Sequence, residues 1–295
     1  MVLGILTLSE DTTTSIVAMI LGIIALVVFV LSEIKRKRKG NVPLLDVGLF
    51  KDRNLRVGTA IMLLAYIVME GGLFAVSLYL QSVLELSAFN TGLTLLPMTV
   101  SLLIFSVAAP GLSGKLNHKV LMAIGSILAI IGCMLLSYQF KMNTTMLDLL
   151  PGMFVLGAGL GFIMALGVDI ALVNIPEESE NNASGITSTG QSLGESMGTA
   201  VIGIILILGV LGGISNAVDT YAPDHSGDEQ YHQDIYDYFQ KIGNVNEIKS
   251  QGSAVVAIVD NLLQDSMAFV MQVTAILMGV IFILTLRLQD KTIKK

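Results

Sequence analysis

Long apolar runs constrain this chain more than any other feature. A helix needs about 20 apolar residues to cross the hydrocarbon core of a membrane, and only helices or closed barrels satisfy their backbone groups there. The sequence has seven such runs, at residues 15–31, 55–80, 92–112, 120–140, 149–173, 185–213 and 267–288. They predict an all-α integral membrane protein with about seven transmembrane helices. Only 14% of the 295 residues are charged, which excludes an ordinary soluble domain.

The positions of Lys and Arg predict the orientation, because loops that stay in the cytoplasm are enriched in them. If residues 34–54 are cytoplasmic, alternating spans place 14 of the 17 Lys and Arg residues on that side. We therefore expect a multi-pass protein of a bacterial or archaeal plasma membrane, with the N-terminus of the first span outside and the C-terminus in the cytoplasm.

These spans divide the chain into four parts. Residues 1–33 are predicted to hold the end of a preceding span and one extra transmembrane helix, and residues 34–54 form a basic cytoplasmic linker. Residues 55–288 form a six-helix bundle, and residues 289–295 a cytoplasmic tail. Within the bundle, residues 214–265 read as an extracytoplasmic loop that carries much of the net charge of −6.

One carboxylate interrupts the run at 55–80. At 100° per residue, Glu70 shares an arc of roughly 60° with Thr59, Tyr66, Ser77 and Gln81, so the polar side chains form one stripe that faces protein or water. A carboxylate at this depth costs several kcal/mol if it is ionised and unpaired, so it takes up a proton, finds a partner or lines a wet cavity. Each outcome fits a proton relay or a cation site.

Two further acids lie within apolar runs. Glu195 shares a polar stripe about 80° wide with Gln191 and other polar residues, and we predict either a transport role or a hydrogen bond that holds a neighbouring helix. Asp169 lies near the cytoplasmic end of its run, where a helix-end role competes with transport. No Lys or Arg occurs in the interior of any run to pair with these acids. Uncompensated negative charge favours protons and lipophilic cations and disfavours anions.

Glycine spacing predicts where helices pack closely. In a membrane, small residues every four positions let two backbones approach. Two sets of glycines have this spacing: the pair Gly157 and Gly161, and the series Gly190, Gly194 and Gly198. We expect the helices that carry them to pack tightly against their neighbours.

Other classes of function find little support. The sequence has no nucleophile elbow, zinc spacing or phosphate loop, and its single cysteine, Cys133, lies inside a run. His225 and His232 lie among acids, and a solvated acidic loop accounts for them without a metal. We expect no enzyme activity, cofactor, metal site or nucleic-acid partner.

At this point the sequence resembles a known family. Residues 41–100 are similar to the corresponding region of the major facilitator superfamily, in its fourteen-span drug:proton antiporter branch. Residues 149–203 are similar as well, through a glycine-rich span, a Pro-Glu-Glu loop, an Ala-Ser-Gly step and a Gln-x-x-Gly-x-x-x-Gly helix. The order and spacing of these motifs carry the resemblance.

The resemblance implies a fold and a function. The chain would be the C-terminal six-helix bundle of a major facilitator fold with one extra preceding span, and its partners would be an N-terminal six-helix half, the bilayer, protons and lipophilic small molecules. The expected function is efflux of lipophilic, cationic compounds against protons by alternating access, with Glu70 in the cavity. Two alternatives stay open: a stand-alone half that pairs with a separate N-terminal half, and a remnant that inserts but transports nothing. Antiport and symport are both compatible with the residues.

Overall fold

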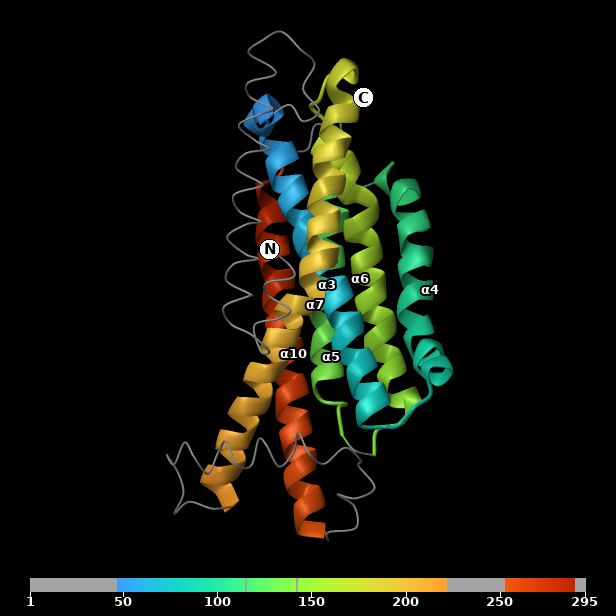
Figure 1. The fold of residues 1–295 in the computed structure, drawn as a ribbon. Helices are drawn as coiled ribbons and strands as arrows, with labels where there is room; N and C mark the ends of the chain where they lie inside the picture. The colour runs from blue at the N-terminus through green and yellow to red at the C-terminus, as the bar shows by residue number, and fades with distance from the viewer. Residues whose placement is uncertain (1–46, 115, 142, 222–252, 290–295) are drawn as a thin grey trace.

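The structure is a computed structural model that describes residues 47–114, 116–141, 143–221 and 253–289. The described part is helical and contains no β-strand. Figure 1 shows its elements, which are η1 (Val47–Lys51), α3 (Arg53–Ser82), α4 (Ala88–Ser113), α5 (His118–Ser137), α6 (Met146–Leu172), α7 (Glu177–Tyr221) and α10 (Ser253–Arg287).

Six of these helices are long and apolar enough to cross a membrane. They coincide with six of the seven predicted runs, and the predicted all-α membrane bundle is thereby confirmed. The run at 15–31 lies outside the described residues, as do most of the linker at 34–54, the tail after residue 289, and His225 and His232.

The region predicted as a loop at 214–265 is partly helical, which corrects its boundaries. α7 continues to Tyr221 and α10 begins at Ser253, so both helices extend past the ends of their neighbours (Figure 1). A reason lies in the packing of the two helices: a Cβ built on Gly213 of α7 would lie 2.9 Å from Leu262 of α10. Such contacts keep a helix ordered beyond its apolar run, which hydropathy alone does not predict.

Side-chain caps fix where several helices begin. The Asp52 side chain accepts a hydrogen bond from the Leu55 amide at 2.9 Å, which starts α3 two residues before the predicted run. Thr145 and Asp148 form a reciprocal capping box at the start of α6. Each cap satisfies amides that have no partner within the helix.

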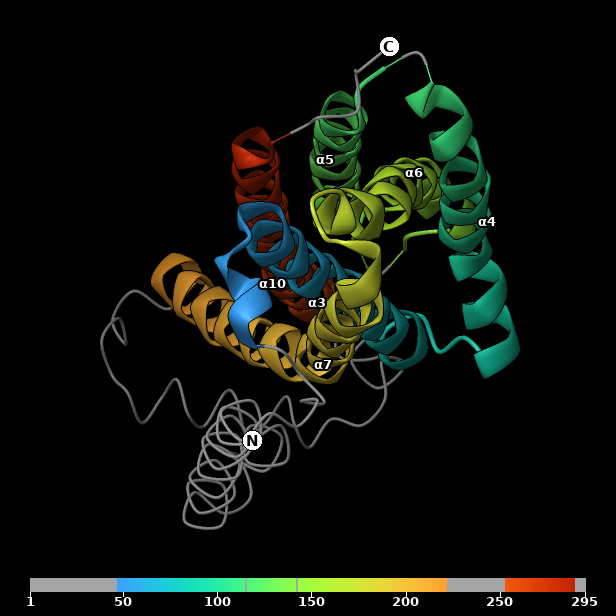
Figure 2. The ribbon, with the colours of Figure 1, turned by 90° about the horizontal axis from the view of Figure 1, so that it is seen from above.

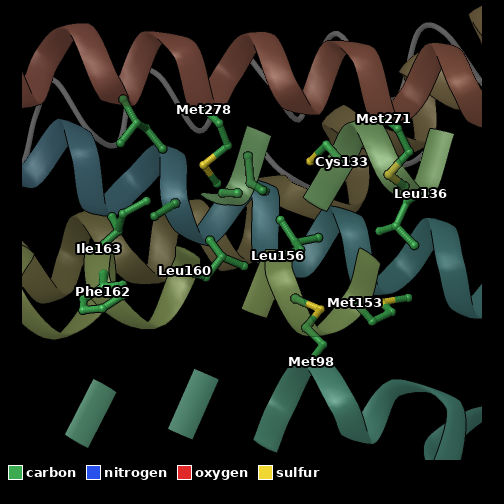
Figure 3. Packing of buried hydrophobic residues seen from close by; sticks show 14 of the residues in the cluster. Met98, Cys133, Leu136, Met153, Leu156, Leu160, Phe162, Ile163, Met271 and Met278 are labelled. Atoms are coloured by element: carbon green, nitrogen blue, oxygen red, sulfur yellow. The ribbon is translucent and has the colours of Figure 1, made fainter. Parts of the chain in front are cut away.

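The helices pack in a connected bundle that Figure 2 shows end on. α3 packs chiefly on α7, α6 packs between α4 and α5, and α10 packs on α5 and α7. α4 lies at the edge of the bundle and has α6 as its one extensive neighbour among the described helices. The buried apolar cluster of Figure 3 lies between these helices and includes Met98, Cys133, Leu136, Met153, Leu156, Leu160, Phe162, Ile163, Met271 and Met278.

α6 meets α4 through glycine. A Cβ on Gly157 would collide with the Met98 carbonyl oxygen and the Ser101 hydroxyl, and one on Gly161 would lie 2.7 Å from the Leu102 carbonyl oxygen. The two backbones therefore touch along this line, as in other small-residue helix pairs.

Candidate functional site

The polar stripe of α3 lies against α7. A Cβ on Gly194 of α7 would lie 2.8 Å from the Tyr66 Cβ, and one on Gly198 would lie 3.0 Å from the Glu70 Cβ. Both side chains thus leave α3 at the glycine seam, which we define as the line of contact that Gly190, Gly194 and Gly198 make with α3. Tyr66 and Glu70 are half-buried there.

Glu195 of α7 completes an acidic group at this seam. Its charge acts on both Glu70 and Tyr66, so the three side chains lie within electrostatic range of one another. Glu195 itself is exposed on the bundle surface, and Glu70 lies deeper. No Lys or Arg occurs in α7 or between residues 57 and 82 of α3. The site consequently carries a negative charge that no cation on these two helices compensates.

The remaining members of the two stripes extend away from this centre. Gln191, half-buried, lies one turn before Glu195 on α7. Ser77 and Gln81 follow Glu70 on α3 by seven and eleven residues, or about 10 and 16 Å at 1.5 Å per residue. The structure therefore gathers Tyr66, Glu70 and Glu195 and places Ser77 and Gln81 farther along the same helix.

Thr59 lies at the N-terminal end of the same stripe. A Cβ on Gly190 would lie 2.6 Å from the Thr59 Cγ2 atom. The Thr59 hydroxyl oxygen is buried and has no hydrogen-bond partner among the described residues.

Asp169 does not join this group. Gly167 and Ala171 of α6 contact Met62 and Gly58 of α3. Asp169 is two residues, or about 200°, from each of them, which places it on the opposite side of α6. Its side chain is exposed. This position fits the helix-end role that the sequence left open.

Sequence reasoning did not single out Gly71. A Cβ on this residue would lie 2.7 Å from the Gly198 carbonyl oxygen and would collide with Ile202 of α7. The signal in the sequence is the Gly71–Gly72 pair directly after Glu70, because glycine inside a helix costs about 1 kcal/mol relative to alanine unless packing requires it.

We also searched the described residues for a metal centre. No group of three or more His, Cys, Asp or Glu side chains that could hold a metal lies within them. Cys133 is buried between α5 and α10 (Figure 3). The chemistry of the site is therefore that of carboxylates and a phenol, which take up and release protons and attract cations.

Six helices long enough to span a membrane, two of which carry the acidic group, define a multi-pass membrane protein. The chain belongs to the major facilitator superfamily, whose model, described as Major Facilitator Superfamily, matches residues 12–199. This match confirms the resemblance that the motifs indicated.

Curated relatives are transport and resistance proteins by name. The chain is 29% identical over 205 residues to the "Probable actinorhodin transporter" of Streptomyces coelicolor, a match that covers 68% of this chain and 35% of the relative. It is 29% identical over 188 residues to the "Multidrug efflux pump LfrA" of Mycolicibacterium smegmatis, covering 64% of this chain and 36% of the relative. It is 31% identical over 179 residues to the "Tetracenomycin C resistance and export protein" of Streptomyces glaucescens, covering 58% and 32%.

The matched part of the chain thus spans about a third of each of these relatives. Membership of this family places the chain among membrane transport proteins and not among enzymes. Its apolar helices and bacterial relatives indicate a cell membrane.

Proposed function

We propose that the chain is the C-terminal half of a proton-coupled multidrug efflux transporter that exports lipophilic cations. The observation that carries this proposal is the position of Glu70, which is half-buried at the glycine seam, within range of the Glu195 charge and away from any Lys or Arg of its own span. The names of the matched relatives, which include drug efflux and resistance proteins, support the same class of substrate.

Exchange of a proton for a cation is possible because the Glu70 carboxyl group can hold either one. A protonated Glu70 is neutral and tolerates apolar surroundings, whereas an ionised Glu70 needs a compensating cation. A lipophilic cation that binds Glu70 favours the ionised form, so the proton leaves to water, and a returning proton displaces the cation. Alternating access would then couple the two, through rocking of one half of the transporter against the other.

The second half is part of this proposal. Apolar side chains of α4 that face away from α6, including Val100, Leu103 and Val107, are exposed in the described structure. We propose that α4 and α7 face a second six-helix bundle, the N-terminal half, across a central cavity into which Glu70 and Glu195 point. The distribution of Lys and Arg supports a cytoplasmic C-terminus in this arrangement.

Inverted membrane vesicles test the function. A pH gradient is formed across vesicles that hold the complete transporter, a lipophilic cation is added, and the collapse of the gradient is followed. We expect Glu70→Gln to abolish cation-dependent collapse and to leave membrane insertion intact. The matched control is Asp169→Asn, which removes a carboxylate from the opposite face of α6 and is expected to leave the exchange unchanged. Normal exchange by Glu70→Gln would remove Glu70 from the mechanism.

A further inference from the structure

Beside Glu70, α3 and α7 meet at a pair of glycines, one turn beyond the contact between Gly194 and the Leu63 carbonyl oxygen. A Cβ on Gly198 would lie 3.0 Å from the Ile67 carbonyl oxygen and 3.1 Å from the Gly71 amide nitrogen. A Cβ on Gly71 would lie 2.7 Å from the Gly198 carbonyl oxygen. Two of the three obstacles at position 198 are backbone atoms, so a side chain there shifts the helices apart by a few tenths of an ångström.

This crossing lies directly beside the two carboxylates. Glu70 precedes Gly71 in α3, and its Cβ is a third atom 3.0 Å from a Cβ on Gly198. Glu195 lies three residues before Gly198, which is about one turn of α7. The separation of the two carboxylates therefore depends on how closely the backbones approach at Gly71 and Gly198.

The electrostatic surroundings of Glu70 are simple within the described residues. The titratable groups that interact with it are Glu195 on α7 and Tyr66 on its own helix. α6 and α10 also pack on α3, and their described charged residues lie near the ends of their spans or, for Asp169, on the far face; these are Asp148, Asp169, Asp265 and Arg287. A change in the α3–α7 distance thus changes both how far Glu70 is buried and how far it lies from the Glu195 charge.

We propose that Gly198 is a positioning residue that sets the burial of Glu70 and its separation from Glu195, and through them the pH at which Glu70 exchanges its proton. The proposal rests on the proposed function for its biological meaning, since Glu70 is the exchanging acid there. Its physical content is independent of transport, because it concerns one carboxyl group and the backbone that holds it.

The same seam provides a matched control. Gly190 also packs on α3, with a Cβ 2.6 Å from the Thr59 Cγ2 atom. It lies eight residues, or about 12 Å, from Gly198 along α7, away from both acids. Alanine at 190 loosens the same pair of helices without separating the backbones beside Glu70.

The experiment measures the proton of Glu70 directly. A lipophilic carbodiimide reacts with protonated carboxyl groups in apolar surroundings, and mass spectrometry of the Glu70 peptide gives labelling as a function of pH in the purified full chain. We expect Gly198→Ala to move the midpoint of this curve by about 0.5 pH unit or more, and Gly190→Ala to leave it within about 0.2 pH unit. Both variants are expected to lower thermal stability, so stability alone does not separate them.

Two results overturn the proposal: an unmoved midpoint in Gly198→Ala, or equal shifts in Gly198→Ala and Gly190→Ala. If Gly198→Ala does not fold, Glu195→Gln gives a second test, because it removes the interacting charge from an exposed position; an unmoved Glu70 midpoint in that variant also overturns the proposal. The proposed function fails separately, when Glu70→Gln retains cation-dependent proton exchange in vesicles.

Discussion

The side chain of Asn54 holds the backbone of Gln289 at both polar groups. Asn54 Nδ2 donates to the Gln289 carbonyl oxygen at 2.6 Å, and Asn54 Oδ1 accepts from the Gln289 amide at 2.9 Å. Asn54 is fully buried, so a satisfied polar contact joins the start of α3 to a residue two positions beyond the end of α10. Lys119 at the start of α5 adds a hydrogen bond to the Leu286 carbonyl oxygen at 2.5 Å. One end of the bundle is thereby closed by contacts among α3, α5 and α10.

Asn54→Ala is expected to destabilise the protein by about 2 kcal/mol, because it removes two hydrogen bonds of a fully buried side chain. Thermal unfolding in detergent measures the loss. Asn143→Ala, at an exposed position of the α5–α6 connection, is the control and is expected to change little. Equal stability of the two variants would contradict a structural role for the Asn54 contact.

Tyr79 makes a comparable contact at the other end of α3. It is 3% exposed, its hydroxyl donates to the Lys141 carbonyl oxygen, and its ring meets Phe140 edge-on with centroids 4.9 Å apart. Tyr79→Phe keeps the ring contact and is expected to cost about 1 kcal/mol, whereas Tyr79→Ala is expected to cost about 3–5 kcal/mol. Denaturant titrations of the two variants test this order. A phenylalanine variant as unstable as the alanine variant would show that the ring contact contributes nothing.

Gly161→Ala tests the contact between α6 and α4. A methyl group there would lie 2.7 Å from the Leu102 carbonyl oxygen, and overpacking of this kind costs about 1–3 kcal/mol. Gly92→Ala is the control, because a Cβ on Gly92 meets nothing within 4 Å and alanine favours the helix. We expect limited proteolysis to release α4 faster in Gly161→Ala and no faster in Gly92→Ala than in the unmodified chain. A release rate unchanged by Gly161→Ala would contradict close packing at this line.

Glu195→Ala separates the two roles that the sequence left open for this acid. Because Glu195 is exposed, its removal is expected to change the free energy of unfolding by no more than about 0.5 kcal/mol. We expect instead an altered pH dependence of cation-driven proton exchange, measured in vesicles. Lower stability with an unaltered pH profile would support the helix-holding role.

Much of the fold follows from the sequence because a membrane imposes long apolar helices. Hydropathy located six of the described spans to within a few residues at most ends. It missed the extensions of α7 and α10, whose order comes from packing of one helix on the other at Gly209 and Gly213. Caps such as Asp52 are local signals, whereas contacts such as Asn54 with Gln289 join residues 235 positions apart and have no local signal.

The periodicity of the sequence predicts only part of the site. The stripes of Glu70 and Glu195 and the glycine series emerge from residue spacing, but spacing does not say which helices meet. The pairing of α3 with α7 places Tyr66 and Glu70 on Gly194 and Gly198 and gives Gly71 its importance. The same kind of information assigns Asp169 to the far face of α6.

Proton release on cation binding tests the central claim most directly. A lipophilic cation such as tetraphenylphosphonium is added to the complete transporter in weakly buffered solution, and the released protons are measured beside the bound cation. The account predicts that the unmodified protein and Asp169→Asn release protons as they bind the cation, and that Glu70→Gln releases none. Equal proton release by Glu70→Gln and the unmodified protein would contradict the account.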